Sequence, residues 1–132
     1  MVSVIAYQAP NRVSDLQAKV PWENSLSSDF GFWKKTTGDP EEIFDNLAEG
    51  DTEDLIASAD VLRFREELLA RWSDIRDVLE PAEFDLAEAP EDSQKYVLLT
   101  LSVRQLDYLP EVLSMAKKNN LVGFSGVAGE PI

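Results

Sequence analysis

Carboxylates are the main side chains of this 132-residue sequence that could carry chemistry. The chain holds 25 Asp and Glu residues but no His and no Cys. This composition lacks the commonest general base, the commonest transition-metal ligand, and every thiolate or disulfide. Catalysis would have to rest on carboxylates, Lys, Tyr or Ser, and chance alone supplies many carboxylate pairs in so acidic a chain. We therefore expect no enzymatic activity, no cofactor and no bound transition metal.

Two short stretches come close to known motifs but lack their essential residues. Residues 123–127, GFSGV, do not match the G-x-S-x-G nucleophile elbow, and no histidine exists to activate Ser125. Residues 51–62, DTEDLIASADVL, fail the EF-hand template, because Ile56 replaces the required glycine and Leu62 the required bidentate glutamate. Neither stretch predicts a catalytic or calcium site.

The negative charge is concentrated in the middle of the chain. The formal net charge is −13, and the stretch from Asp39 to Asp92 holds 19 acidic and only 4 basic residues. Such a field repels nucleic acids and anionic membranes and attracts basic proteins, so we expect no nucleic-acid or membrane partner. The segment 31–38, GFWKKTTG, has aromatic and basic residues, but it is more typical of a core Trp beside solvated lysines. Solubility alone is the competing explanation for the acidity.

Ten carboxylates are the candidate partner-binding residues. Within 38–54, GDPEEIFDNLAEGDTED, Asp39 suits a helix N-cap, and Glu41 and Glu42 complement the positive end of a helix. The other acids of this stretch have no such role. The candidates form a first acidic patch of Asp45, Glu49, Asp51, Glu53 and Asp54, and a second acidic patch of Glu83, Asp85, Glu88, Glu91 and Asp92.

Helices that would position these acids follow from apolar spacing and end signals. Pro40 suits a first helical turn and Gly50 a helix stop. Apolar residues recur at three- and four-residue spacing from residue 61 to residue 79, which predicts one long helix over 58–81 with Trp72 on its buried stripe. A third helix lies within 104–120, with Pro110 in its first turn, Asp107 near its cap, and Asn119 or Asn120 in a left-handed conformation at its end.

Strands are predicted at 2–8, 95–103 and 121–126, with 30–33 as either a short strand or a core loop and 127–132 as a tail. Ser14 can cap a short helix that Pro21 stops. The element order predicts a single globular domain over 1–132 of the α/β (α+β) class. We expect a two-layer sandwich, with helices packed mainly on one face of a small sheet and a C-terminal strand–helix–strand unit.

Four stretches of the chain resemble a group of small acidic bacterial proteins that often accompany secreted toxins, as immunity proteins do. They are FWKKTTGDPEEIFDNLAEG at 32–50, LRFREELLARWSDIRDVLEP at 62–81, YVLLTLSV at 96–103, and LPEVLSMAKKNNLVGFSGVAGEPI at 109–132. The likeness covers about Phe30 to the C-terminus and consists of packing motifs. It implies a binding role and carries over no catalytic residue.

Charge and resemblance together predict a cytoplasmic immunity protein. Its partner would be a cognate toxin or another basic protein, whose basic active or substrate-binding surface it would occlude. The cytoplasmic location follows because no apolar run could span a bilayer and the N-terminus lacks signal-peptide features. The alternative is an adaptor or secretion chaperone that holds its partner in an apolar groove, with Trp22, Phe30 and Trp33 exposed.

Overall fold

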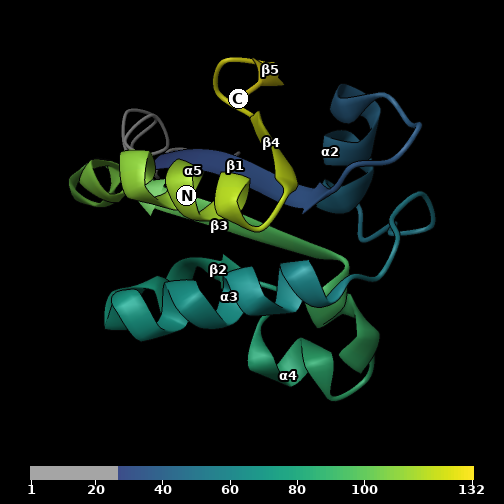
Figure 1. Ribbon diagram of the computed structural model, residues 1–132, viewed down its shortest axis with the longest axis horizontal. Helices are drawn as coiled ribbons and strands as arrows, with labels where there is room; N and C mark the ends of the chain where they lie inside the picture. The colour runs from purple at the N-terminus through teal and green to yellow at the C-terminus, as the bar shows by residue number, and fades with distance from the viewer. Residues whose placement is uncertain (1–26) are drawn as a thin grey trace, which may run out of the picture.

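The computed structural model describes residues 27–132 (Figure 1). The predicted strand 2–8, the helix from Ser14 to Pro21, and Trp22 lie outside this range. The elements are β1 (Ser27–Lys34), α2 (Pro40–Ala48), α3 (Ala59–Arg71), the 3-10 helix η2 (Ser73–Val78), β2 (Leu79–Glu80), α4 (Glu83–Leu86), the 3-10 helix η3 (Pro90–Gln94), β3 (Tyr96–Ser102), the 3-10 helix η4 (Arg104–Tyr108), α5 (Leu109–Lys118), β4 (Leu121–Ser125) and β5 (Glu130–Pro131). No helix in this range is long and apolar enough to cross a membrane.

The sheet has the strand order β2-β3-β1-β4-β5, with every neighbouring pair antiparallel. Residues 30–33, predicted as a strand or a loop, lie in the central strand β1. Phe32 is paired with Val97 of β3 on one side and with Gly123 of β4 on the other. The predicted strand–helix–strand unit is therefore present as β3–α5–β4, with β1 inserted between its two parallel strands.

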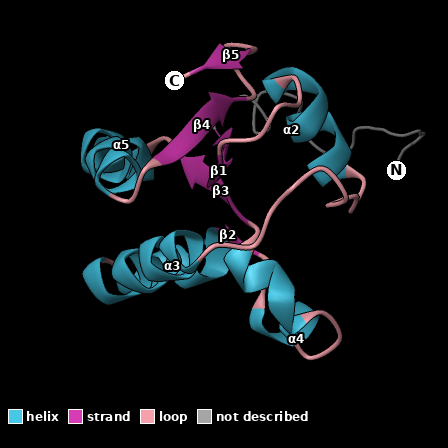
Figure 2. Ribbon diagram, turned by 45° about the vertical axis from the view of Figure 1, so that its right-hand side comes forward, coloured by secondary structure: helices cyan, strands magenta, loops and turns pink. Residues whose placement is uncertain are grey.

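Helices cover both faces of the sheet, with the two longest on the same face. Figure 2 shows the strands between α5 on one side and α2 on the other. The first core contains buried residues of α3 and α5, and the second contains those of α2. The predicted α+β class with helices mainly on one face is confirmed, and α2 adds a smaller layer on the second face.

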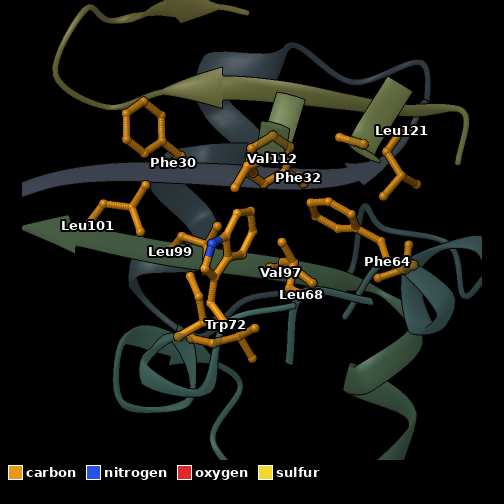
Figure 3. Packing of buried hydrophobic residues seen from close by; sticks show 14 residues of the cluster. Phe30, Phe32, Phe64, Leu68, Trp72, Val97, Leu99, Leu101, Val112 and Leu121 are labelled. Atoms are coloured by element: carbon orange, nitrogen blue, oxygen red, sulfur yellow. The ribbon is translucent and has the colours of Figure 1, made fainter. Parts of the chain in front are cut away.

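The first core joins β1 and β3 to α3 and α5 (Figure 3). Phe32 of β1 meets Phe64 of α3 edge to face, with ring centroids 5.2 Å apart. Val97, Leu99 and Leu101 alternate along β3 and are fully buried against the helices. Apolar side chains recur every second residue along β3 and about every 3.6 residues along α3, and these two sets pack together as one apolar layer.

The second core lies beneath α2. Trp33, the next residue after Phe32, points to this face and is 1% exposed. It packs in one cluster with Ile43 and Leu47 of α2. The ring of Phe44 passes so close to Gly126 that a Cβ atom there would lie 2.8 Å from it. Gly126 therefore lets the turn after β4 approach the helix.

The predicted start and stop of α2 are confirmed. The Asp39 carboxylate accepts a hydrogen bond from the Glu42 amide at 3.2 Å, and Pro40 occupies the first turn. Gly50 follows the helix with φ of +83°, a conformation that disfavours residues with a Cβ atom. Capping chemistry readable from the sequence thus determines both ends of the helix.

The predicted helix over 58–81 is wrong in its second half. Ser58 caps α3 as expected, but the helix ends at Arg71, Trp72 is extended, and a 3-10 helix follows. The apolar stripe is still buried throughout. Two tertiary contacts stabilise this break in the helix. The Trp72 ring stacks on the Tyr108 ring with centroids 4.5 Å apart, and the Asp74 carboxylate accepts a hydrogen bond from the Tyr108 hydroxyl at 3.0 Å.

Two predictions near the C-terminus are also corrected. Asp107 does not cap α5, because Tyr108 occupies the N-cap position and makes no side-chain capping bond. The expected tail contains β5, which returns to pair with β4. Asn120 has φ of +61° at the end of α5, as predicted.

We predict that Trp72→Ala lowers the free energy of unfolding by about 3–5 kcal/mol, because it removes a buried ring and its stack on Tyr108. Val127→Ala is the control, since Val127 is 68% exposed. Chemical denaturation of both variants measures the difference. A loss below about 1 kcal/mol for Trp72→Ala would show that this ring contributes little to the core.

Candidate functional site

The first acidic patch covers the end of α2 and the segment that leads to α3. Its five carboxylates are all exposed, and none forms an ion pair with any residue between 27 and 132. Only Asp51 has a side-chain hydrogen bond, which it accepts from the Glu53 amide at 3.0 Å. The patch therefore presents negative charge that the described part of the fold does not neutralise.

The position of Glu49 makes the first acidic patch electrostatically unfavourable. Glu49 is the C-cap residue of α2, and the last turn of this helix has no basic side chain. The C-terminal end of a helix carries partial negative charge and is stabilised by cations. The carboxylates of Asp45, Glu49 and Asp51 thus add repulsion to a helix end that stability alone would fill with lysine or arginine.

The second acidic patch lies on α4, η3 and the turn between them. Glu83 is its one member in an ion pair within the described residues, with its Oε2 atom 2.5 Å from Nη1 of Arg76. The Asp85 carboxylate accepts a hydrogen bond from the Ala82 amide at 3.3 Å and so closes the first turn of α4. Glu88 and Glu91 are exposed without a described partner.

A backbone hydrogen bond joins the segments that carry the two patches. The Ser58 amide, at the end of the first segment, donates to the Gln94 carbonyl of η3 at 2.8 Å. Figures 1 and 2 show α2 at the upper end and α4 at the lower end of the right-hand half of the view, with residues 51–58 between them. The ten predicted residues thus form two separate patches, on segments that this hydrogen bond connects.

Several carboxylates of this side surround Tyr96. Burial, together with the negative charges of Asp92, Glu80 and Asp85, raises the pKa of the Tyr96 phenol to about 12. Burial also raises the pKa of the Asp92 carboxyl, with Glu91 adding to the shift and Lys95 opposing it. The ionised form of Asp92 is therefore disfavoured in the folded state.

Arg65 binds the backbone next to the second acidic patch. It lies on α3, is 6% exposed, and donates a hydrogen bond from Nη1 to the Pro81 carbonyl at 2.7 Å. Pro81 directly precedes the segment that forms α4. A buried guanidinium is costly unless it makes such bonds, so Arg65 helps to fix the base of α4.

Phe84 is the feature of this side that the sequence analysis missed. It lies on α4 between Glu83 and Asp85, and its exposure of 78% is the highest of the large apolar side chains described. Ile56 is 52% exposed beside the first acidic patch. A signal existed in the sequence, because Phe84 has no large apolar residue three or four positions away that would place it on a buried helical stripe.

The structure assigns no chemistry to the residues that come near to catalytic motifs. Ser125 is buried, and its Oγ atom accepts a hydrogen bond from the Ala128 amide at 3.1 Å, which closes the turn before β5. Between residues 27 and 132, no three Asp or Glu side chains are grouped so that they could hold a metal ion. The candidate site is thus a surface and not a cleft with reactive groups.

Comparison with protein-family models, curated proteins and solved structures finds no match to this chain. The candidate site therefore rests on the residues and their geometry.

We predict opposite effects for two Asp→Asn variants on the melting temperature near neutral pH. Asp92→Asn raises it, because a folded-state pKa above 3.8 means that ionised Asp92 destabilises the fold once the pH exceeds that value. Asp74→Asn lowers it, because hydrogen bonds from Gln105 and Tyr108 lower the pKa of Asp74 and stabilise its ionised form.

Thermal unfolding followed by circular dichroism at several pH values measures both effects. The stabilisation by Asp74 is present above the ordinary value of 3.8 and is lost as the pH falls through its lower folded-state value. Both differences should therefore shrink in acid. A lower melting temperature for Asp92→Asn at neutral pH would show that Asp92 serves the stability of the fold.

Proposed function

We propose that the chain is a cytoplasmic immunity protein that neutralises a cognate bacterial toxin by occluding its basic active or substrate-binding surface. The observation that carries the proposal is Phe84, an aromatic side chain 78% exposed on α4, the helix that also carries Glu83 and Asp85 of the second acidic patch. An exposed aromatic ring has no use in a surface that serves solubility alone. It is suited to a partner that offers both basic groups and an apolar contact.

The carboxylates would act first, through long-range attraction. Toxins that act on nucleic acids or other anionic substrates need basic clefts to bind them. An acidic face steers such a toxin into contact and raises the association rate by orders of magnitude at low salt. In the complex, the two acidic patches take the positions that the charges of the substrate would occupy, which blocks the cleft.

Phe84 would then supply the short-range anchor. Binding energy at interfaces is concentrated in a few buried side chains, often aromatic, that weaker polar contacts shield from water. Burying a phenylalanine ring contributes about 1.5–3 kcal/mol. Glu83 and Asp85 precede and follow Phe84 on the same short helix, so we expect basic residues around a matching pocket. The bond from Arg65 to the Pro81 carbonyl fixes the backbone at the start of α4 before binding, which lowers the entropic cost.

The cost of the acidic patches to stability also favours a binding role. Glu49 lies at the negative end of α2, and burial raises the pKa of Asp92. Residues that oppose stability are typical of functional surfaces.

The alternative function, an adaptor or secretion chaperone, predicts exposure of Trp22, Phe30 and Trp33, and two of these side chains are buried. Phe30 and Trp33 are 5% and 1% exposed and belong to the two cores. Neither side chain is therefore exposed as this alternative predicts. Trp22 lies outside the described residues.

A growth assay tests the proposed function. The probe is the C-terminal domain of the secreted protein encoded directly beside this chain, expressed in a bacterial host with and without the chain. We expect the domain alone to arrest growth and co-expression to restore it. No such neighbour, or growth arrest that persists at full expression of the chain, would contradict an immunity function.

We predict that reversing Glu49, Asp51, Glu53 and Asp54 to Lys slows association with this toxin domain at least about tenfold at low salt and flattens the salt dependence. The melting temperature should stay the same or rise, because self-repulsion falls. Phe84→Ala should mainly speed dissociation. Surface plasmon resonance measures both rates.

The matched control reverses four exposed acids outside both patches, Glu66, Asp77, Asp107 and Glu130, and so changes the net charge equally. An equal effect of this control would show that only net charge matters. Unchanged binding of both variants would place the interface elsewhere. A collapsed fold in the first variant would show that those carboxylates are structural.

A further inference from the structure

An apolar cavity of about 540 Å³ opens where β1 ends and β4 begins. Its walls come from β1, α5, β4, the loop before α2, and the C-terminal residues that follow the turn after β4. Phe32 and Trp33 form part of the wall and are almost fully buried, so this side of the cavity is held rigidly by both cores. None of the ten acidic-patch residues lines it. The cavity is therefore separate from the surface proposed for the toxin.

Two lysines without an ion-pair partner among residues 27–132 line this cavity. Lys35 and Lys117 both line it, and neither forms an ion pair with another residue between 27 and 132. Their immediate neighbours behave differently: Lys34 is 2.6 Å from Asp60, and Lys118 is 3.4 Å from Glu67. With a net charge of −13, carboxylate partners are plentiful elsewhere on this chain. The cavity thus combines apolar walls with two available cations.

We propose that this cavity binds a small amphipathic carboxylate, with its apolar tail against the walls and its carboxylate between Lys35 and Lys117. The volume falls in the range of small-molecule sites, about 300–1,000 Å³, which are mostly apolar with a few oriented polar groups. A fully hydrated inorganic anion would leave the apolar walls unused. A neutral or cationic ligand would leave the lysines unpaired. An acid with a medium-length aliphatic chain satisfies both features.

The cavity is suited to a small ligand because its rigid wall is already formed. Gly123 of β4 lies against the Phe32 ring, where a Cβ atom would come within 2.8 Å of it. The Phe32 ring is in turn held by Phe64 of α3. Binding therefore needs no rearrangement of this wall, which reduces the entropic cost for a ligand with few atoms.

A nuclear magnetic resonance titration with sodium decanoate, below its micelle concentration, tests the proposal on the full chain. We expect saturable shifts at the Trp33 indole and at the amides of Gly38, Gly123 and Ile132. The double variant Lys35→Gln/Lys117→Gln should weaken binding at least about tenfold. Lys118→Gln is the matched control, because Lys118 follows Lys117 directly but does not line the cavity. 1-Decanol, with the same chain and no charge, should bind at least about tenfold more weakly.

Each other outcome would overturn the proposal. Shifts that do not saturate, or that spread over the molecule, would mean that the cavity holds no defined ligand. Equal binding of decanol would mean that the lysines do not select a carboxylate. A loss with Lys118→Gln as large as that of the double variant would point to the general charge of α5. A dimer in sedimentation velocity that the double variant dissociates would identify a second copy as the occupant.

Discussion

The pairing of β1 with both β3 and β4 is the constraint on which the rest of the fold depends. β1 is the only described strand with a long partner on each side. Its consecutive residues Phe32 and Trp33 point to opposite faces and enter the two separate cores. Because side chains alternate along a strand, one strand can anchor α3 and α5 on one face and α2 on the other. A one-residue slip of β1 would exchange these rings and disrupt both cores.

Because the two cores stabilise the sheet and the long helices, the segments that connect these elements can carry exposed charge. The cores lie on the sheet and the long helices, whereas the acidic patches lie on the end of α2, on α4 and on η3, which the Ser58–Gln94 hydrogen bond joins. Marginal stability depends on the buried apolar area, so exposed carboxylates that repel one another can be tolerated there. The lysine-bearing cavity lies at the ends of β1 and β4, away from the ten acids. The fold thus keeps surfaces of opposite charge apart.

Local chemistry explains which parts of the structure could be predicted from the sequence. Asp39, Pro40 and Gly50 define α2 because capping requires only neighbouring residues. The helix break at Trp72 could not be predicted, since apolar residues keep the same spacing through the 3-10 helix and the contacts that hold it come from Tyr108, 36 positions later. The insertion of β1 between β3 and β4 is likewise non-local. The ten acids were predicted from charge density, and the lack of apolar neighbours at helical spacing was a signal for Phe84, whereas the cavity depends on three-dimensional placement.

Hydrogen–deuterium exchange of the chain, free and in the presence of the proposed toxin domain, tests most directly the proposal that the acidic patches bind a basic partner. The account predicts that binding slows exchange in residues 49–56 and 82–94, the segments that carry both patches, Ile56 and Phe84. Residues 113–123, which line the lysine-bearing cavity, should exchange at the same rate in both states. Protection confined to 113–123, with no change in the acidic segments, would contradict the account.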